Sequence, residues 1–233
     1  VMYKQKPFFI VFEGVEGCGK SFQSRKLFNN LKKKNLSTII TREPGGTKSA
    51  ELIRNLILKD YFNKSKKDKF DKYTDTLLYL AARNEHIKTK IKPALEKKKI
   101  VICDRFTDST IAYQVHGKQV NQNFITNIHK VILKGIKPNL TFVLKVSSKV
   151  SKKRLLKRKT KNRYDNFSQK FYDKAQRSFL KIAKNKRNYF ILDSSKNDKV
   201  LEKKIFHITS NYLKNKWFYL IFITPQKLKY YLV

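Results

Sequence analysis

FFIVFEGVEGCGKS, residues 8–21, decides the fold of this chain. Residues 8–13 are almost all apolar and β-favouring, as expected of a strand that is buried on both faces of a parallel sheet. Residues 14–21 match the pattern G-x-x-x-x-G-K-[ST], and residues 22–33 then repeat apolar side chains at helical spacing. A strand, a glycine loop and a helix in this order are the context in which the pattern indicates a phosphate-binding loop.

The glycines of this loop let backbone N–H groups turn toward an anion at the N-terminus of the following helix. Lys20 is expected to reach the β- and γ-phosphates of a nucleoside triphosphate, and the hydroxyl of Ser21 is expected to hold Mg²⁺. The residues predicted to bind the triphosphate are Gly14, Val15, Glu16, Gly17, Cys18, Gly19, Lys20 and Ser21.

The chain carries a formal net charge of +37 over 233 residues, which raises the question of a polyanionic partner. Its 44 lysines greatly outnumber its 10 arginines and are scattered over nearly every predicted helix. A lysine-rich composition therefore explains much of the excess, and we predict no specific binding of nucleic acid. Weak, non-specific binding at low salt is still expected for such a charge.

Two cysteines, Cys18 and Cys103, make no disulfide framework, which is typical of a reduced intracellular protein. The four histidines have no metal-binding spacing, and we interpret them as structural or solvated. The first apolar run is the strand of the phosphate loop rather than a secretory signal, and the apolar residues 217–223 are too few to span a bilayer. We predict a cytoplasmic protein without a membrane partner.

Further strands are predicted at residues 37–41, 99–103, 140–146 and 189–192, and further helices at residues 50–58, 74–89, 109–114, 122–134, 148–156, 168–186 and 200–213. This alternation predicts an α/β fold with a five-stranded parallel sheet and helices on both faces, in three layers. We assign residues 1–216 to a single domain, because the length requires no second one. Residues 217–233 form a C-terminal extension to which no role is assigned.

Seven stretches of the chain together resemble the bacterial type of thymidylate kinase. They occur in that family's order over residues 7–214 and read FEGVEGCGKS, TREPGGT, IRNLIL, LLYLAARNEH, CDRFTDSTIAYQ, KPNLTFVLKV and KRKTKNRYDN. EPGGT and DRFTDSTIAYQ are the most specific of them. The resemblance implies a P-loop kinase fold with a short lid at residues 157–166. It also implies transfer of the γ-phosphoryl group of ATP to dTMP, giving dTDP and ADP, by a homodimer.

By resemblance, Arg54 and Arg105 hold the phosphate of dTMP, while Arg42 and Glu43 shape the loop beside it. Planar guanidinium groups suit this task because each can donate two parallel hydrogen bonds to phosphate oxygens. Glu16 is expected to approach the sugar and the reacting phosphate of the acceptor.

The catalytic residues that the resemblance implies are Lys20, Glu16, Asp104, Arg158 and Arg163. Asp104 ends a predicted strand, where it can contact Mg²⁺ through water, orient the acceptor or have a purely structural role. The phosphate loop contains no arginine. In this family, members whose loop lacks an arginine supply catalytic arginines from the lid instead. Tyr164, also in the lid, is expected to contact the sugar.

Recognition of the base is expected to involve Tyr79, Arg83, Thr110 and Gln114, because buried donors and acceptors discriminate strongly against a wrong base. Tyr79 can stack on a pyrimidine ring, or it can be an ordinary core residue. Ser109 can act in place of Thr110, and the sequence does not separate the two. Tyr79 stands where the family usually has phenylalanine.

Two other functions remain open at this point. One is a related P-loop kinase that acts on another nucleoside or nucleotide. The other is a basic nucleic-acid-binding protein that uses its phosphate loop to hydrolyse ATP. EPGGT and DRFTDSTIAYQ favour the thymidylate kinase interpretation over both.

Overall fold

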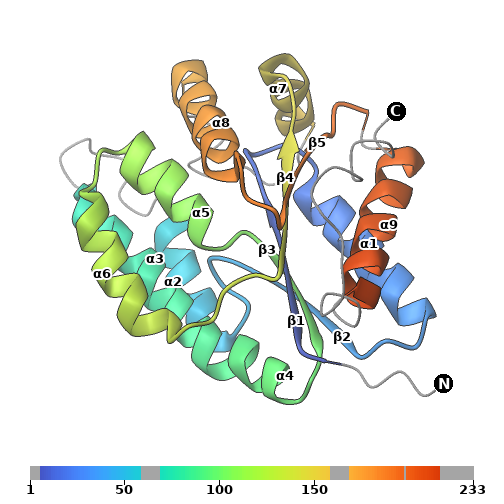
Figure 1. The fold of residues 1–233 in the computed structure, drawn as a ribbon. Helices are drawn as coiled ribbons and strands as arrows, with labels where there is room; N and C mark the ends of the chain where they lie inside the picture. The colour runs from blue at the N-terminus through green and yellow to red at the C-terminus, as the bar shows by residue number, and fades with distance from the viewer. Residues whose placement is uncertain (1–5, 59–68, 158–167, 197, 216–233) are drawn as a thin grey trace.

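The computed structural model describes residues 6–58, 69–157, 168–196 and 198–215. In these residues, strands and helices alternate around one five-stranded sheet (Figure 1). The strands are β1 (Phe8–Glu13), β2 (Thr38–Arg42), β3 (Ile100–Asp104), β4 (Leu140–Lys145) and β5 (Tyr189–Asp193). All neighbouring strands are parallel, in the order β2-β3-β1-β4-β5. The predicted α/β architecture is confirmed.

Strand β1 lies at the centre of the sheet, between β3 and β4. Ile10 is opposite Ile102 of β3 on one side and opposite Leu140 of β4 on the other. All six residues of β1 are buried, which explains why the strand is an almost unbroken apolar run rather than an alternating one.

The side chains of β1 divide between two apolar clusters because successive residues of a strand point to opposite faces. Phe8, Ile10 and Phe12 belong to the larger cluster, and Phe9 and Val11 to the smaller one. The sheet is therefore covered by apolar side chains on both faces, which is the three-layer packing predicted from the alternation of elements.

Helices lie on both sides of the sheet in Figure 1, with α1 and α9 on one side and α2, α3, α4 and α6 on the other. The α-helices are α1 (Lys20–Lys33), α2 (Lys48–Leu58), α3 (Lys72–His86), α4 (Lys92–Glu96), α5 (Thr107–Thr110), α6 (Gln122–Leu133), α7 (Ser148–Leu156), α8 (Gln169–Ala183) and α9 (Lys199–Asn215). Most predicted boundaries agree within two residues. Ser168 caps α8, because its hydroxyl accepts a hydrogen bond from the Phe171 N–H.

Two predicted helices differ in geometry from the prediction. The helix predicted at 74–89 begins at Lys72, because Asp71 caps it, and it passes through a π-helical turn, η2 (Ile87–Ile91), into α4. Pro93 lies in the first turn of α4, where its missing N–H costs least. The helix predicted at 109–114 is the short α5 followed by a second π-helical turn, η3 (Ile111–Gly117). Such turns are frequent at functional sites.

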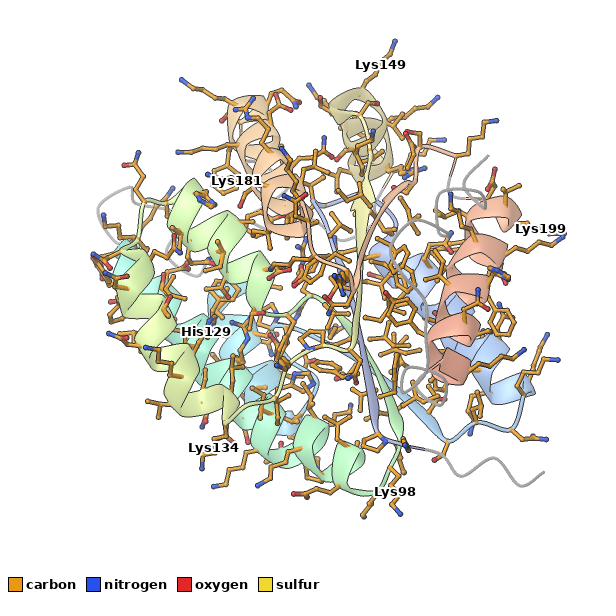
Figure 2. All side chains as sticks on the ribbon, viewed as in Figure 1. Lys98, His129, Lys134, Lys149, Lys181 and Lys199 are labelled. Atoms are coloured by element: carbon orange, nitrogen blue, oxygen red, sulfur yellow. The ribbon has the colours of Figure 1, made fainter. Side chains whose placement is uncertain are left out.

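The lysine side chains project from every part of the described surface (Figure 2). The labelled Lys98, Lys134, Lys149, Lys181 and Lys199 come from five separate segments and point away from the body. Lysines therefore occur on widely separated segments of the described residues, in agreement with the scatter seen in the sequence. Within these residues, no helix has the length and apolar character needed to cross a membrane. Both cysteines are free and buried.

The predicted lid, apart from residue 157, and the predicted C-terminal extension lie outside the described residues. The division of the chain into a domain at 1–216 and an extension at 217–233 therefore stays a prediction.

Candidate active site

A cavity of about 1260 Å³ opens beside the phosphate loop. Its walls come from the segments that follow β1, β2 and β3, together with α2 and α3. This is the carboxyl edge of the sheet beside the central strand, where open α/β sheets bind ligands. The predicted site residues that line the cavity are Glu16, Gly17, Gly19, Lys20, Ser21, Arg42, Glu43, Arg54, Tyr79, Arg83, Asp104, Arg105, Ser109, Thr110 and Gln114.

The phosphate loop needs glycine for both conformation and space. Gly14 has a φ of +135°, and a Cβ there would lie 2.5 Å from the carbonyl oxygen of Leu144 on β4. At Gly17, with a φ of +71°, a Cβ would lie 2.8 Å from the carbonyl oxygen of Ser151 on α7. A side chain at either position would force the loop away from its neighbours.

Lys20 is buried at the start of α1, and its ammonium group folds back over the loop. The Nζ atom donates to the carbonyl oxygens of Gly14 at 2.9 Å and Val15 at 2.8 Å, and lies 3.6 Å from Cys18 Sγ. These contacts hold a positive charge at the position from which an anion in the loop can be reached.

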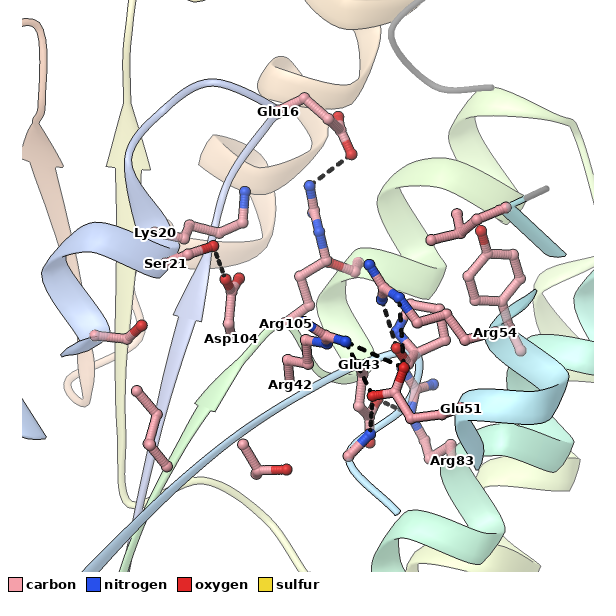
Figure 3. Close-up of a pocket in the computed structure, with 18 of the residues that line it drawn as sticks. Glu16, Lys20, Ser21, Arg42, Glu43, Glu51, Arg54, Arg83, Asp104 and Arg105 are labelled. Carbon is pink, nitrogen blue, oxygen red and sulfur yellow. Dashed lines mark hydrogen bonds and ion pairs between the residues drawn. The ribbon is translucent and has the colours of Figure 1, made fainter. Parts of the chain in front are cut away.

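Ser21 and Asp104 meet at the end of β3, and the Ser21 hydroxyl donates to Asp104 Oδ2 (Figure 3). The other carboxylate oxygen, Oδ1, is buried without a hydrogen-bond partner among the described residues. A hydroxyl beside a carboxylate with an unsatisfied oxygen fits a hard divalent cation. No group of three or more His, Cys, Asp or Glu capable of holding a metal occurs in the described residues. Mg²⁺ would therefore take its remaining ligands from substrate phosphates and water, as it usually does.

Arg105 and Glu16 form an ion pair of 2.6 Å above the loop. Arg105 also donates to Gly14 O at 2.9 Å and to Ser109 Oγ at 3.1 Å, while Tyr113 Oη donates to the second oxygen of Glu16 at 2.6 Å. Burial raises the pKa of Glu16, but the charges of Arg105 and Lys20 outweigh it, so the pKa lies below its usual value. Glu16 is therefore an ionised carboxylate at neutral pH.

Glu13, the last residue of β1, holds Ser109 and the backbone of Phe106 in place. The sequence assigned it no role. Its carboxyl is fully buried and accepts hydrogen bonds from Phe106 N at 2.8 Å and from Ser109 Oγ at 2.6 Å. Burial and the nearby Asp108 raise the pKa of Glu13 to about 8. Ser109 is thus engaged on both sides, by Glu13 and by Arg105.

Glu51 of α2 was also missed, and it lies between two of the predicted arginines (Figure 3). Arg42 Nη2 is 3.1 Å from both of its oxygens, and Arg54 Nε is 3.9 Å from one of them. The backbone N–H of Gly46 donates to Glu51 at 2.9 Å, and Arg54 Nη1 donates to the carbonyl oxygen of Pro44 at 2.5 Å.

Arg83 is almost completely buried on α3, and four of its five N–H groups are engaged. Nε donates to Glu43 at 2.7 Å, Nη1 to Thr110 Oγ1 at 2.7 Å and to His129 Nε2 at 2.8 Å, and Nη2 to Phe106 O at 2.9 Å. Since a guanidinium has five donors, one N–H on Nη2 has no partner within the described part of the chain.

Two histidines, His86 and His129, hold this network in place. They are structural residues, as interpreted from the sequence, but they lie in the site and not elsewhere in the fold. His86 is fully buried between Thr41 Oγ1 at 2.6 Å and Glu43 Oε1 at 3.1 Å. Burial and the charge of Arg83 lower the pKa of His129 to about 3, so its ring stays neutral and accepts. Burial raises the pKa of Glu43, but Arg83 and His86 bring it below its usual value. His86 ends the stretch LLYLAARNEH, but the sequence assigned neither histidine a place in the site.

Gln114 and Tyr79 face the same cavity from η3 and α3. Gln114 is only 2% exposed, and its Nε2 has no hydrogen-bond partner among the described residues. A buried, unpaired amide in a cavity wall is free to donate to a ligand. Tyr79 is half-buried, lines the cavity and also packs against the larger apolar cluster. Tyr79 is therefore both part of the cavity wall, where it could stack on a base, and part of the apolar core.

Arg154 of α7 is a further cavity residue that the sequence did not indicate. It donates to the carbonyl oxygens of Gly17 at 3.2 Å, Ser194 at 2.9 Å and Ser195 at 2.7 Å. The remaining predicted site residues, Arg158, Arg163 and Tyr164, lie outside the described residues.

Comparison with known proteins agrees with this geometry. The sequence model of the family described as "Thymidylate kinase" matches residues 12–205. The chain is 41% identical over 192 residues to the thymidylate kinase of Onion yellows phytoplasma, covering 81% of this chain and 89% of that protein. It is 38% identical over 212 residues to the thymidylate kinase of Mycoplasma capricolum, covering 89% and 97% of the two chains.

A similar solved structure is the crystal structure of thymidylate kinase from Ehrlichia chaffeensis. It superposes with a TM-score of 0.64 at 33% sequence identity and covers 81% of this chain and 87% of that one. The family match spans both the phosphate loop and the arginine cluster of the cavity, so the chain belongs to the thymidylate kinase family of ATP-dependent nucleoside monophosphate kinases.

Proposed function

We propose that this protein transfers the γ-phosphoryl group of ATP to dTMP, giving dTDP and ADP. The observation that carries the proposal is one cavity that is lined by two groups of cationic residues, each of which could hold a phosphate. The phosphate loop with Lys20 forms one, and Arg54 and Arg105 belong to the other. Because both reactants are anions, positive groups are needed to hold both and to neutralise charge in the transition state.

On the donor side, the backbone N–H groups of residues 14–21 hold the ATP phosphates. Lys20 gives up its contacts with Gly14 O and Val15 O to reach the β- and γ-phosphates. Ser21 and Asp104 hold Mg²⁺, Asp104 through water, and their contact and the unpaired Oδ1 support this assignment. When bound, Mg²⁺ neutralises negative charge on the β- and γ-phosphate oxygens.

On the acceptor side, Arg54 and Arg105 hold the phosphate of dTMP beside the loop shaped by Arg42 and Glu43. An oxygen of that phosphate attacks the γ-phosphorus, and the bond from phosphorus to the bridging oxygen of ADP breaks. The ionised Glu16 restrains Arg105 through the 2.6 Å ion pair, so that the guanidinium is already oriented when the acceptor binds. Two further roles stay predictions: stabilisation of transition-state charge by Arg158 and Arg163, and contact with the sugar by Tyr164.

At the base, Gln114 Nε2 and the remaining N–H of Arg83 are available donors, and Tyr79 can stack on the ring. Thr110 is favoured over Ser109 as the hydroxyl that meets the base. Thr110 Oγ1 accepts from Arg83 and keeps its own proton for a ligand, whereas the Ser109 proton is donated to Glu13. Donors left unpaired by a wrong base give strong discrimination.

The first prediction concerns the choice of acceptor. With ATP and Mg²⁺, we expect dTMP to be phosphorylated at least ~10²-fold more efficiently, in kcat/KM, than AMP, GMP or dCMP, because only thymine satisfies the buried donors. ADP release with each monophosphate in turn measures this. Equal turnover of dTMP and AMP would contradict the proposal. ATP hydrolysis stimulated by nucleic acid more than by dTMP would favour the nucleic-acid-binding ATPase, for which no comparison speaks.

We further propose a homodimer, formed through α2 and α3. These helices pack side by side, and they carry exposed leucines that nothing in the described chain covers fully. Leu52 is 69% exposed, Leu56 46% and Leu77 47%. Exposed apolar residues that gather on adjacent helices are typical of a protein–protein interface.

A second prediction tests this interface. Leu52→Asp places a charge in the proposed contact, and we expect the dimer to dissociate at micromolar concentration, as measured by sedimentation velocity. Val200→Asp on α9, where Val200 is 72% exposed, is the matched control and should leave the dimer intact. A monomeric parent protein, or a dimer insensitive to Leu52→Asp, would exclude this interface.

The cytoplasmic location and the absence of a specific nucleic-acid or membrane partner also stay predictions. The two free cysteines are compatible with a reducing compartment.

A further inference from the structure

Glu51 places a carboxylate among the cations of the acceptor site. Both oxygens accept from Arg42 Nη2 at 3.1 Å, one also accepts from Gly46 N at 2.9 Å, and Arg54 Nε lies 3.9 Å away (Figure 3). In Figure 3, the Glu51 side chain reaches from α2 toward the arginine side chains. Two guanidinium groups and one backbone N–H, those of Arg42, Arg54 and Gly46, thus surround a single carboxylate.

The loop after β2 is shaped to admit this carboxylate. A Cβ on Gly45 would lie 2.5 Å from Glu51 Oε1 and 2.8 Å from its carboxyl carbon, at a φ of +123°. The glycine of the EPGGT stretch thus leaves room for the Glu51 side chain, and a side chain there would expel it. Glu51 is therefore packed into the loop and is not simply a solvated surface charge.

Glu51 also offsets a repulsion. Burial and the positive charge of Arg42 lower the pKa of Arg54 and so disfavour its charged form, whereas Glu51 favours that form. Burial raises the pKa of Glu51, but the Gly46 N–H, Arg42 and Arg54 together bring it below its usual value. An ionised carboxylate between two guanidinium groups lets them stand close together before any phosphate arrives.

We infer that Glu51 is a positioning residue for the acceptor phosphate, which assembles Arg42, Arg54 and the Gly46 N–H into a preformed anion site. The inference rests on the proposed function and assigns a role within it. Arg54 Nη2 and Arg42 Nη1 have no hydrogen-bond partner among the described residues, so both guanidiniums keep donors for a phosphate while Glu51 holds them. Preassembly of this kind strengthens binding because the ordering is already complete in the free protein.

Glu51→Gln tests the inference, because it keeps the shape and one acceptor oxygen but removes the charge. We expect the KM for dTMP to rise roughly five- to twenty-fold, within the range of a charge-assisted hydrogen bond that is partly exposed. The KM for ATP should be unchanged. The Ki of thymidine as a competitor of dTMP should also be unchanged, because thymidine carries no phosphate. A general loss of structure would change all three constants and lower Tm.

Two further variants complete the experiment. Glu96→Gln removes an exposed carboxylate paired with Lys92 at 3.7 Å, far along the chain, and should alter none of these constants. In an Arg42→Gln background, Glu51→Gln should have much less effect, because the two act as a unit. An unchanged or lowered KM for dTMP in Glu51→Gln, an equal loss of thymidine binding, or full additivity with Arg42→Gln would overturn the inference. Failure of the parent enzyme to phosphorylate dTMP would instead reject the proposed function, so the two failures are distinguishable.

Discussion

Replacing Lys20 with methionine is expected to lower kcat for phosphoryl transfer by roughly 10²–10³-fold, the scale seen when one stabilising donor is removed from an active site. Methionine has nearly the same length but no charge. The ammonium of Lys20 is held beside the loop by Gly14 O and Val15 O, and from there it can turn to the phosphate oxygens on which charge develops during transfer. Steady-state ADP release at saturating ATP and dTMP measures the effect.

Lys26→Met is the matched control. Lys26 lies on the same helix but does not line the cavity, and it contacts Glu202 at 3.7 Å and the Phe22 ring at 5.5 Å, so we expect kcat to stay within about two-fold of the parent. If Lys20→Met retained near-normal kcat in a folded protein that still binds ATP, the loop lysine would have no part in the chemistry.

Arg105→Gln is the second substitution with a large expected effect, a loss of roughly 10²–10³-fold in kcat/KM for dTMP. The scale is that of breaking a buried ion pair, about 3–5 kcal/mol, since the change both removes a phosphate ligand and takes from Glu16 its ion-pair partner. The guanidinium now contacts Glu16 at 2.6 Å, Gly14 O at 2.9 Å and Ser109 Oγ at 3.1 Å. Arg105→Lys should recover only part of the loss, because a lysine cannot make these three contacts together.

A change in pH dependence separates this effect from a simple loss of charge. In the parent enzyme the pKa of Glu16 is lowered, since Arg105 and Lys20 outweigh the burial that raises it. Its contribution to stability is therefore present above the ordinary glutamate pKa and lost only as the pH falls through the lower, folded-state value. Without Arg105 the folded-state pKa of Glu16 rises, so the acidic limb of kcat/KM must move to higher pH.

The exposed Arg177 on α8 provides the control, since Arg177→Gln removes the same charge from the chain without touching the site. The pH profile of Arg177→Gln should match that of the parent. An acidic limb that did not move in Arg105→Gln would show that Glu16 is not held ionised by Arg105.

The sequence predicted those parts of the fold and the site that a local pattern of residues marks. Strand β1 is an almost entirely apolar run because it is buried on both faces, and the glycine loop that follows it has a chemical pattern of its own. The position of Asp104 beside Ser21 could also be expected, because parallel strands bring their carboxyl ends to one edge of the sheet. These signals depend on neighbouring residues or on the sheet alone.

The partners of the charged groups could not be found in this way. Glu13 contacts Ser109 across 96 positions, and Arg83 reaches His129 across 46, and neither contact has a spacing rule. The contacts of Glu51 could not be predicted either, although its partners are close in the sequence, because they depend on how the loop after β2 folds back onto α2. The π-helical turn that aims Gln114 into the cavity likewise has no signal in the apolar periodicity.

The sequence by itself thus determined the parallel sheet and the phosphate loop, and it singled out Arg42, Arg54, Arg83 and Arg105, which line one cavity. Hydrophobic periodicity and backbone chemistry act locally, so they can be seen in a linear chain. Only the tertiary structure decided which carboxylate holds each arginine, that Ser109 is engaged while Thr110 keeps a free donor, and that the pKa of Glu13 is raised while that of Glu16 is lowered. Such properties arise from burial and from charges on distant segments, and these exist only once the chain has packed.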